Sequence, residues 1–324
     1  MNEPIINLLR RALLMKQSNR RCAACLIVRA RGSTPQSAGA LMLVDEDLNT
    51  FGTIGGGCVE AEIRRRAHAM LVAGDDFVGG PVSFKLDHDY GWDDGLICGG
   101  TIEMLVAPLP DEHALARAID DVRMRRPASV TFEAVGPDGM AMTYALDLPP
   151  RDRLYIAGAG HVGQALARLA LPLEFETTIF DDREDLLRRF APDGCHRSAG
   201  EIAAQLRESP VDDRTYVVIV TRGHKNDEQA LHAVVGRGAK YVGMIGSRRK
   251  IKLIFDDLKD MGVDPRALAG VHAPIGVDIG SVSVEEIALS IAAELVQVRR
   301  SDKHAAVRAV SDHRSETHAS QAKP

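Results

Sequence analysis

Apolar residues in the first half of the chain follow the dense, short spacing that favours β-strands. The runs CAACLIVRA, ALMLVDE and TIEMLVAP are rich in branched apolar residues and are bounded by glycine, proline and serine. Residues 128–148 are typical of a hairpin around GPDG. Two segments of this half have helical rather than strand-like spacing. Residues 1–17 predict an amphipathic helix rather than a signal peptide, and the segment after GGGC has apolar residues at helical spacing.

The pattern changes after the pair Pro149–Pro150, where we expect a domain boundary. LYIAGAG, ETTIFDD, TYVVIVTRG and KYVGMIG predict strands, and each is followed by a segment with helical spacing. The predicted fold class is therefore α/β, with a C-terminal Rossmann-like parallel sheet and helices on both faces. Residues 151–300 are assigned to this domain, and residues 1–150 to a smaller N-terminal α+β domain.

The final helix is expected near residues 284–300. Ser283 and Glu286 stand at the spacing of a capping box at its start. Beyond it the chain is polar and has few apolar residues, so residues 301–324 are expected to be a disordered tail.

Composition narrows the class of protein. The 324 residues are 45% hydrophobic and 26% charged, as in globular proteins, and this length suggests two domains. A net charge of −5 and the lack of a basic, aromatic-rich stretch argue against nucleic acid as a partner. No apolar run reaches the roughly 20 residues that a membrane span needs. Five cysteines, an odd number in a long chain, argue against a disulfide framework and favour a reducing cytoplasm.

The first motif with a chemical meaning is GAGHVG, formed by Gly158, Gly160 and Gly163 between a predicted strand and a predicted helix. Asp181 and Asp182 end the next strand, where an acidic residue can hold a ribose hydroxyl. This context predicts that a pyrophosphate binds against the helix N-terminus. The alternative is a tight turn that binds nothing, with both acids solvated.

Two further loops, TRGH and GSRRK, are expected to open on the same crevice. Arg222 and Arg248 make each loop a candidate anion site, and Ser247 is a predicted N-cap. His224 either contacts a phosphate or is hydrogen-bonded within its own turn. A solvated basic face at a helix start is the alternative for the arginines.

The cysteines divide into two groups. Cys22 and Cys25 are three residues apart, which on a strand places their side chains on opposite faces. No second pair is present to complete a zinc site, so we interpret both as core residues. Cys195 is also interpreted as structural.

Cys58 and Cys98 differ from the others because glycines surround them. Cys58 opens a predicted helix, whose dipole favours a thiolate. Cys98 precedes Gly99 and Gly100, which would let a ligand approach the backbone. Each thiol is either functional or a filler of a tight turn. The acidic residues at 87–94 are interpreted as a solvated loop rather than as metal ligands.

Seven motifs together resemble the XdhC/CoxI-type accessory proteins of molybdenum hydroxylases. They are GSTPQSAGALMLV, GTIGGGCVEAEI, GLICGGTIEMLV, LYIAGAGHVGQALA, TRGHKND, YVGMIGSRRK and VHAPIGVDIGSVSVEEIALSIAAEL. The resemblance extends from about Ala24 to Leu295 and so covers most of the chain.

The resemblance implies a maturation chaperone without catalytic activity of its own. Such a protein binds the molybdenum cofactor, as molybdopterin or its nucleotide-extended form, and supports its sulfuration and insertion into xanthine dehydrogenase or a related enzyme. A cysteine desulfurase is the implied sulfur donor. The family's candidates for functional cysteines correspond here to Cys58 and Cys98, which are candidate molybdenum contacts. Independently of the resemblance, the N-terminal domain is so small that we expect it to rest on the Rossmann domain or on a second copy of the chain, which would give a homodimer.

Two other functions remain open. One is an NAD(P)-dependent oxidoreductase in which His224 donates a proton, although nothing before residue 150 indicates a separate carbonyl-substrate site. The other is a nucleotide-binding sensor that takes NAD or ATP but no pterin.

Overall fold

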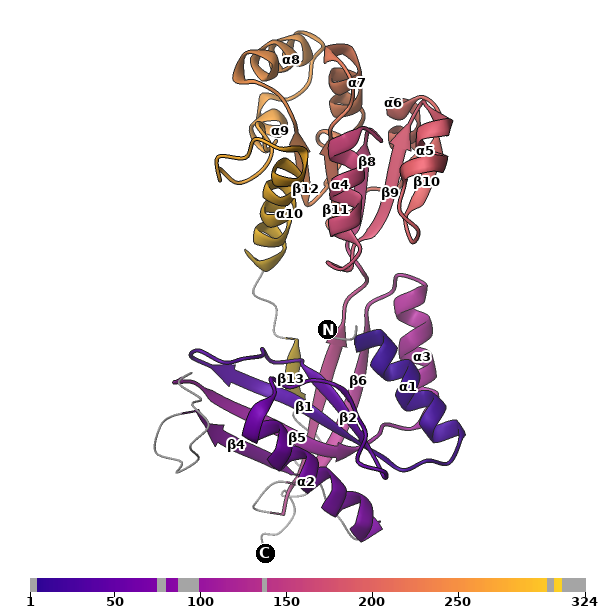
Figure 1. Cartoon of the computed structure of the whole chain (residues 1–324), viewed down its shortest axis with the longest axis vertical. Helices are drawn as coiled ribbons and strands as arrows, with labels where there is room; N and C mark the ends of the chain where they lie inside the picture. Colours follow the sequence, from indigo (N-terminus) through magenta and orange to yellow (C-terminus); the bar gives the residue numbers. More distant parts are fainter. Residues whose placement is uncertain (1–4, 75–79, 87–98, 136–138, 302–305, 311–324) are drawn as a thin grey trace, which may run out of the picture. The chain divides into compact units, whose positions relative to one another are not determined.

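The computed structural model describes residues 5–74, 80–86, 99–135, 139–301 and 306–310 (Figure 1). Contacts between residues divide the chain into two compact units. One holds the residues up to Pro150 together with Val307–Val310, and the other begins at Arg151. Among the helices described, none is both long enough and apolar enough to cross a membrane.

The first unit contains a five-stranded antiparallel sheet in the order β3-β2-β1-β5-β4. Its strands are β1 (Cys22–Arg31), β2 (Leu41–Asp45), β3 (Thr50–Gly52), β4 (Pro81–Lys85) and β5 (Thr101–Pro108). Its helices are α1 (Ile5–Gln17), α2 (Gly57–Ala73) and α3 (Glu112–Arg123).

Both faces of the central strand β1 are buried, which explains why its sequence is apolar without alternation. Ala24 and Leu26 belong to the core formed with α1 and α3, whereas Ile27 belongs to the core formed with α2. Cys22 lies in the first of these cores and Cys25 in the second. The prediction that these two cysteines are core residues on opposite faces is confirmed.

A second, three-stranded antiparallel sheet has the order β13-β7-β6. β6 (Ala128–Val135) and β7 (Ala141–Leu148) pair along their whole length, which confirms the predicted hairpin. β13 (Val307–Val310) pairs with β7, and Val307 is buried in the α1–α3 core. The expectation of a disordered tail is therefore wrong for these four residues. The physical reason is that β7 offers a free strand edge and an apolar site for Val307.

The second unit is a five-stranded parallel sheet in the order β10-β9-β8-β11-β12. Its strands are β8 (Arg153–Ala157), β9 (Glu176–Asp181), β10 (His196–Ala199), β11 (Thr215–Ile219) and β12 (Tyr241–Met244). Its helices are α4 (His161–Ala170), α5 (Glu184–Phe190), α6 (Ile202–Glu208), α7 (His224–Val234), α8 (Arg248–Asp260), α9 (Pro265–Ala269) and α10 (Val284–Ser301).

Helices cover both faces of this parallel sheet (Figure 1). Leu154 and Ile156 of β8 face the core formed with α4, α5 and α10, while Tyr155 and Ala157 face the core formed with α6 to α9. Strands buried on both faces read as continuous apolar runs, as this sequence does. The predicted α/β fold with a Rossmann-like sheet is confirmed.

Candidate functional site

The strand order of the parallel sheet reverses between β8 and β11, and a cavity of about 600 Å³ opens beyond the carboxyl ends of these strands. Its wall includes Gly160 and His161 at the start of α4, Arg183 after β9, and Thr221 and Arg222 after β11. Ligands of open α/β sheets bind at such a switch point. The volume lies within the range of small-molecule sites, which is about 300–1,000 Å³.

The three glycines of the GAGHVG loop have different physical roles. Gly158 has φ +116°, and a Cβ added there would lie 2.5 Å from the carbonyl oxygen of Val220. A Cβ on Gly163 would collide with the carbonyl oxygen of Gly158. These two glycines are required by packing. At Gly160, by contrast, a Cβ would meet no atom within 4 Å, so this position leaves open space at the N-terminus of α4.

That open space fits the approach of a phosphate. Unsatisfied backbone N–H groups and the helix dipole favour an anion at this end of α4. The guanidinium groups of Arg183 and Arg222 belong to residues of the same cavity wall. The arrangement can therefore hold a phosphate or pyrophosphate by backbone and guanidinium donors together.

Asp181, the predicted ribose ligand, is buried and used inside the protein. Its carboxylate accepts hydrogen bonds from the backbone N–H of Ala159 at 2.7 Å and from Arg183 Nε at 2.8 Å. Burial raises the pKa of Asp181, but the hydrogen bonds from Arg183 and Ala159 outweigh it and lower the pKa to about 2. The neighbouring Asp182 has the exposed carboxylate of the pair.

Arg222 lies on the cavity wall, and the loop that carries it is anchored by a buried carboxylate. Asp227, in the first turn of α7, accepts hydrogen bonds from the backbone N–H of Thr221 at 3.2 Å and from its hydroxyl at 2.5 Å. The second carboxylate oxygen pairs with Lys250 of α8. The ends of β11, α7 and α8 are thus held together beside the cavity.

The GSRRK loop contributes less to this cavity than the sequence suggests. Ser247 is the N-cap of α8, as predicted, and its hydroxyl accepts the N–H of Lys250 at 3.3 Å. Arg248 lies instead on a separate cavity of about 430 Å³, together with Phe255 and Pro274. Neither residue is among those that line the cavity at the switch point.

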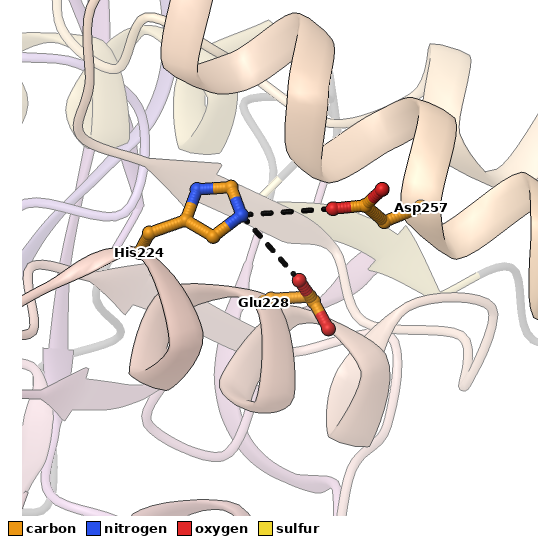
Figure 2. Close-up of side chains that lie close together, drawn as sticks. All are labelled: His224, Glu228 and Asp257. Carbon is orange, nitrogen blue, oxygen red and sulfur yellow. Dashed lines mark ion pairs between the residues drawn. The ribbon is translucent and has the colours of Figure 1, made fainter.

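His224 begins α7, and its imidazole is directed at two carboxylates (Figure 2). Nε2 lies 3.6 Å from Glu228 Oε2 on the same helix and 3.6 Å from Asp257 Oδ2 on α8. His224 is absent from the wall of the switch-point cavity, which removes it from the position expected of a proton donor to a ligand there.

In the first unit, two glycine-containing segments, at Gly55 and at Gly99–Gly100, lie against residues 31–36. A Cβ on Gly55 would come within 2.6 Å of Pro35 Cγ, and a Cβ on Gly100 would collide with the carbonyl oxygen of Ser33. Gly99 has φ +64°, which favours glycine. The two glycines after the CGG cysteine are therefore accounted for by the local backbone.

Cys58 is the second residue of α2, and its side chain is half-buried. A thiol there lies at the helix end that favours a thiolate. Cys98, together with the acidic residues at 87–94, lies outside the described residues. Its predicted role therefore stays a prediction.

The remaining described cysteines are unsuited to act as thiolates. Burial raises the pKa of Cys22 to about 12, with a smaller contribution from Asp45. Burial also raises the pKa of Cys25, which is fully enclosed, and the pKa of Cys195. Their interpretation as structural residues agrees with this environment.

Sequence reasoning missed several polar groups that organise the sites. Arg183, Asp227 and Lys250 were not singled out, because their importance depends on partners that the fold supplies. Glu228 had a usable signal, since it stands four residues after His224 and so lies on the same helix face. Asp257 had none, because it reaches His224 from another helix.

The parallel sheet, its glycine loop and its switch-point cavity define a unit of the Rossmann type. Two family models match the chain. One, described as the XdhC and CoxI family, matches residues 15–78, and one described as the XdhC Rossmann domain matches residues 154–295. The chain belongs to the XdhC and CoxI family.

Several known proteins are similar to this chain. The uncharacterized protein YqeB of Escherichia coli is 29% identical over 91% of this chain, which spans only about half of that relative, 46% of its length. A probable xanthine dehydrogenase subunit of Bacillus subtilis is 24% identical over 85% of this chain and 92% of its own length. The molybdenum cofactor insertion chaperone PaoD of E. coli is 23% identical over 90% of this chain and 88% of its own length.

A solved structure supports the fold. The crystal structure of a xanthine dehydrogenase from Bacillus halodurans matches with a TM-score of 0.78 at 24% identity. The match covers 93% of this chain and 97% of that chain.

Proposed function

We propose that this chain is a non-catalytic maturation chaperone for molybdenum hydroxylases. In this role it binds the molybdenum cofactor and supports its sulfuration and its insertion into xanthine dehydrogenase or a related enzyme. The observation that carries the proposal is the switch-point cavity, whose wall combines the open N-terminus of α4 at Gly160 with Arg183 and Arg222. The similarity to the molybdenum cofactor insertion chaperone PaoD and to the probable xanthine dehydrogenase subunit of B. subtilis adds support.

The cavity residues suit the phosphate end of the cofactor. Molybdopterin carries a phosphate, alone or extended by a nucleotide, and backbone N–H groups with two guanidinium groups are suited to bind either form. When bound, the cofactor supplies the molybdenum centre that the client enzyme uses. Nothing in this role requires a proton donor in the cavity.

Thiolates are the proposed contacts for the sulfur-rich molybdenum end. Cys58 and Cys98 are the proposed residues, either as soft ligands of molybdenum or as carriers of persulfide sulfur. The support for Cys58 is its place in the first turn of α2 with a half-buried side chain. For Cys98 the support is the family resemblance of the CGG motif.

A nucleotide-binding sensor is the second candidate, because the space at Gly160 would also accept the pyrophosphate of NAD. An oxidoreductase is less well supported, since His224 pairs with Glu228 and Asp257 and does not line the cavity. The chaperone and the sensor differ in whether pterin is bound.

The proposal includes partners and a location. A cysteine desulfurase supplies the sulfur, a xanthine dehydrogenase-type enzyme receives the cofactor, and the exchange takes place in the cytoplasm. The chaperone acts as a homodimer. Light scattering across a range of protein concentrations tests the homodimer, and a monomer at every concentration would contradict it.

The decisive experiment measures pterin on the purified full-length chain. Protein from a host that makes the cofactor is oxidised, and pterin fluorescence is expressed per folded molecule. We expect the wild type to carry pterin and Arg222→Ala to carry several-fold less. Arg188→Ala is the matched control, because its side chain is exposed on α5 and is not among the residues that line the cavity. NAD binding without any pterin would favour the sensor instead.

A further inference from the structure

The second unit contains a cluster of metal-ligating side chains that lies apart from the switch-point cavity. We propose that His224, Glu228 and Asp257 form a binding site for a divalent transition-metal ion of the Zn²⁺ class (Figure 2). One potential ligand atom from each residue lies within 4.8 Å of the other two. Among the residues that the structure describes, no other such group of histidine, cysteine or acidic residues is found.

The spacing along α7 brings two of the three ligands together. His224 and Glu228 are four residues apart, so their side chains project from the same face, one turn from each other. Two ligands at this spacing on a single helix are a frequent half of a metal site. The helix itself sets their separation, and Asp257 of α8 completes the set from the facing side (Figure 2).

The two helices are held in place next to the cluster. Asp227, one residue before Glu228, is fully buried and pairs with Lys250 of α8. Leu231 of α7 and Ile254 of α8 belong to one apolar core. The ligands are therefore carried by elements whose relative position does not depend on a metal, as a preorganised site requires.

The distances are close to those that a shared ion would need. Bonds of about 2.0–2.2 Å to one ion place neighbouring ligand atoms about 3.0–3.6 Å apart at ordinary coordination angles. His224 Nε2 already lies 3.6 Å from both carboxylate oxygens. The ligand atoms of Glu228 and Asp257 lie within 4.8 Å of each other, so binding requires the side chains to close around the ion.

The ligand set indicates the class of metal. An imidazole nitrogen with two carboxylates suits Zn²⁺ and its first-row neighbours, whereas Mg²⁺ and Ca²⁺ prefer oxygen ligands alone. The two carboxylates carry more negative charge than one imidazole can balance, and a divalent ion would balance it. Because the side chains of His224 and Asp257 are 42% and 54% exposed, the ion would be reached from solvent and would keep water in its open positions.

Metal titration of the full-length protein tests this inference. Protein stripped with a chelator is titrated with Zn²⁺, Co²⁺, Mn²⁺ and Mg²⁺ by calorimetry. We expect one site with affinities in the order Zn²⁺ > Co²⁺ > Mn²⁺ and far weaker Mg²⁺ binding. His224→Gln, Glu228→Gln and Asp257→Asn should each weaken Zn²⁺ binding by about 10-fold or more. The absorption spectrum with Co²⁺ should lack a thiolate charge-transfer band.

Two substitutions of the same type on the same helices serve as controls. His232→Gln on α7 and Asp260→Asn on α8 remove an exposed imidazole and an exposed carboxylate outside the cluster, and they should leave Zn²⁺ affinity within about two-fold. Melting curves establish that every variant is folded. The inference is overturned if the wild type binds no Zn²⁺, or if the three cluster variants bind it as the controls do. In that case the cluster is a surface ion pair only. Pterin content, measured on the same proteins, reports separately on the proposed chaperone function.

Discussion

The carboxylate of Asp181, at the end of β9, accepts a hydrogen bond of 2.7 Å from the backbone N–H of Ala159 in the glycine loop. This contact joins the ends of two neighbouring strands, and Arg183 holds the carboxylate from the other side. An acidic residue in the position expected of a ribose ligand thus supports the shape of the loop that leads to Gly160.

The role of Asp181 can be tested by stability measurements. Asp181→Asn should lower the free energy of unfolding at pH 7 by about 2 kcal/mol, because the native pKa is near 2 and the ordinary value is 3.8. Because the pKa of Asp181 is lower in the folded than in the unfolded state, its carboxylate stabilises the fold at pH values above the unfolded pKa. This stabilisation is lost as the pH falls through the folded pKa. The difference between wild type and variant should therefore shrink between about pH 4 and pH 2 in urea denaturation.

The exposed neighbour provides the control for that prediction. Asp182→Asn should change stability by less than about 0.5 kcal/mol at any pH, since its carboxylate is largely solvated. Equal effects at both positions would contradict the structural role of Asp181.

Gly160 and Gly163 should respond differently to enlargement. Gly163→Ala should destabilise the second unit by about 3 kcal/mol, because the added methyl group meets the carbonyl oxygen of Gly158. Gly160→Val should cost about 1 kcal/mol or less, because its Cβ meets open space. The added isopropyl group should nevertheless reduce binding of phosphate-bearing ligands, measured by titration with NAD and by pterin content. Unchanged binding in the folded variant would count against the cavity as a ligand site.

Alkylation should distinguish the cysteines in the native state. Burial raises the pKa of Cys22 to about 12 and raises that of Cys25, so both should resist iodoacetamide at pH 8 until the protein unfolds. Cys58, half-buried at the start of α2, should be labelled in the folded protein. Peptide mass spectrometry after timed quenching gives the order in which the cysteines are alkylated. Native labelling of Cys25 as fast as that of Cys58 would contradict the assignment.

Replacement by serine tests the same thiols for function. Cys58→Ser and Cys98→Ser should each lower cofactor content per folded molecule several-fold, because a hydroxyl neither binds molybdenum as a thiolate does nor carries sulfane sulfur. Cys25→Ser should instead destabilise the fold by about 1–3 kcal/mol by burying a hydroxyl in an apolar core. Its cofactor content per folded molecule should stay unchanged. Full cofactor content in both Cys58→Ser and Cys98→Ser would refute the thiol role.

The two glycines after Cys98 should also differ in how much their replacement destabilises the fold. Gly100→Ala should destabilise the first unit by about 2–3 kcal/mol, because its methyl group would press on the carbonyl oxygens of Ser33 and Arg31. Gly99→Ala meets no atom within 4 Å and should cost only about 1 kcal/mol for its positive φ. Thermal unfolding followed by circular dichroism measures both. A larger loss at Gly99 than at Gly100 would show that the packing account is wrong.

Local patterns in the sequence predicted most of the second unit. β8, the glycine loop and α4 are consecutive, so strand, turn and helix signals adjoin along the chain. The capping box is equally local: Ser283 accepts the N–H of Glu286 at 3.2 Å, and Glu286 accepts the N–H of Ser283 at 2.9 Å. Interactions of this kind depend on residues within one turn, which is why sequence spacing is enough to find them.

The sequence by itself therefore determined the parallel sheet, its glycine loop and the burial of Cys22 and Cys25, because the spacing of apolar residues and the identity of adjoining residues specify them. Only the tertiary structure decided which polar side chains pair with one another. Asp181 turns inward because Arg183 and the N–H of Ala159 meet its carboxylate there. Asp257 reaches His224 because α7 and α8 share an apolar core and the ion pair between Asp227 and Lys250. A carboxylate's partner is set by packing between distant segments, and no local pattern records it.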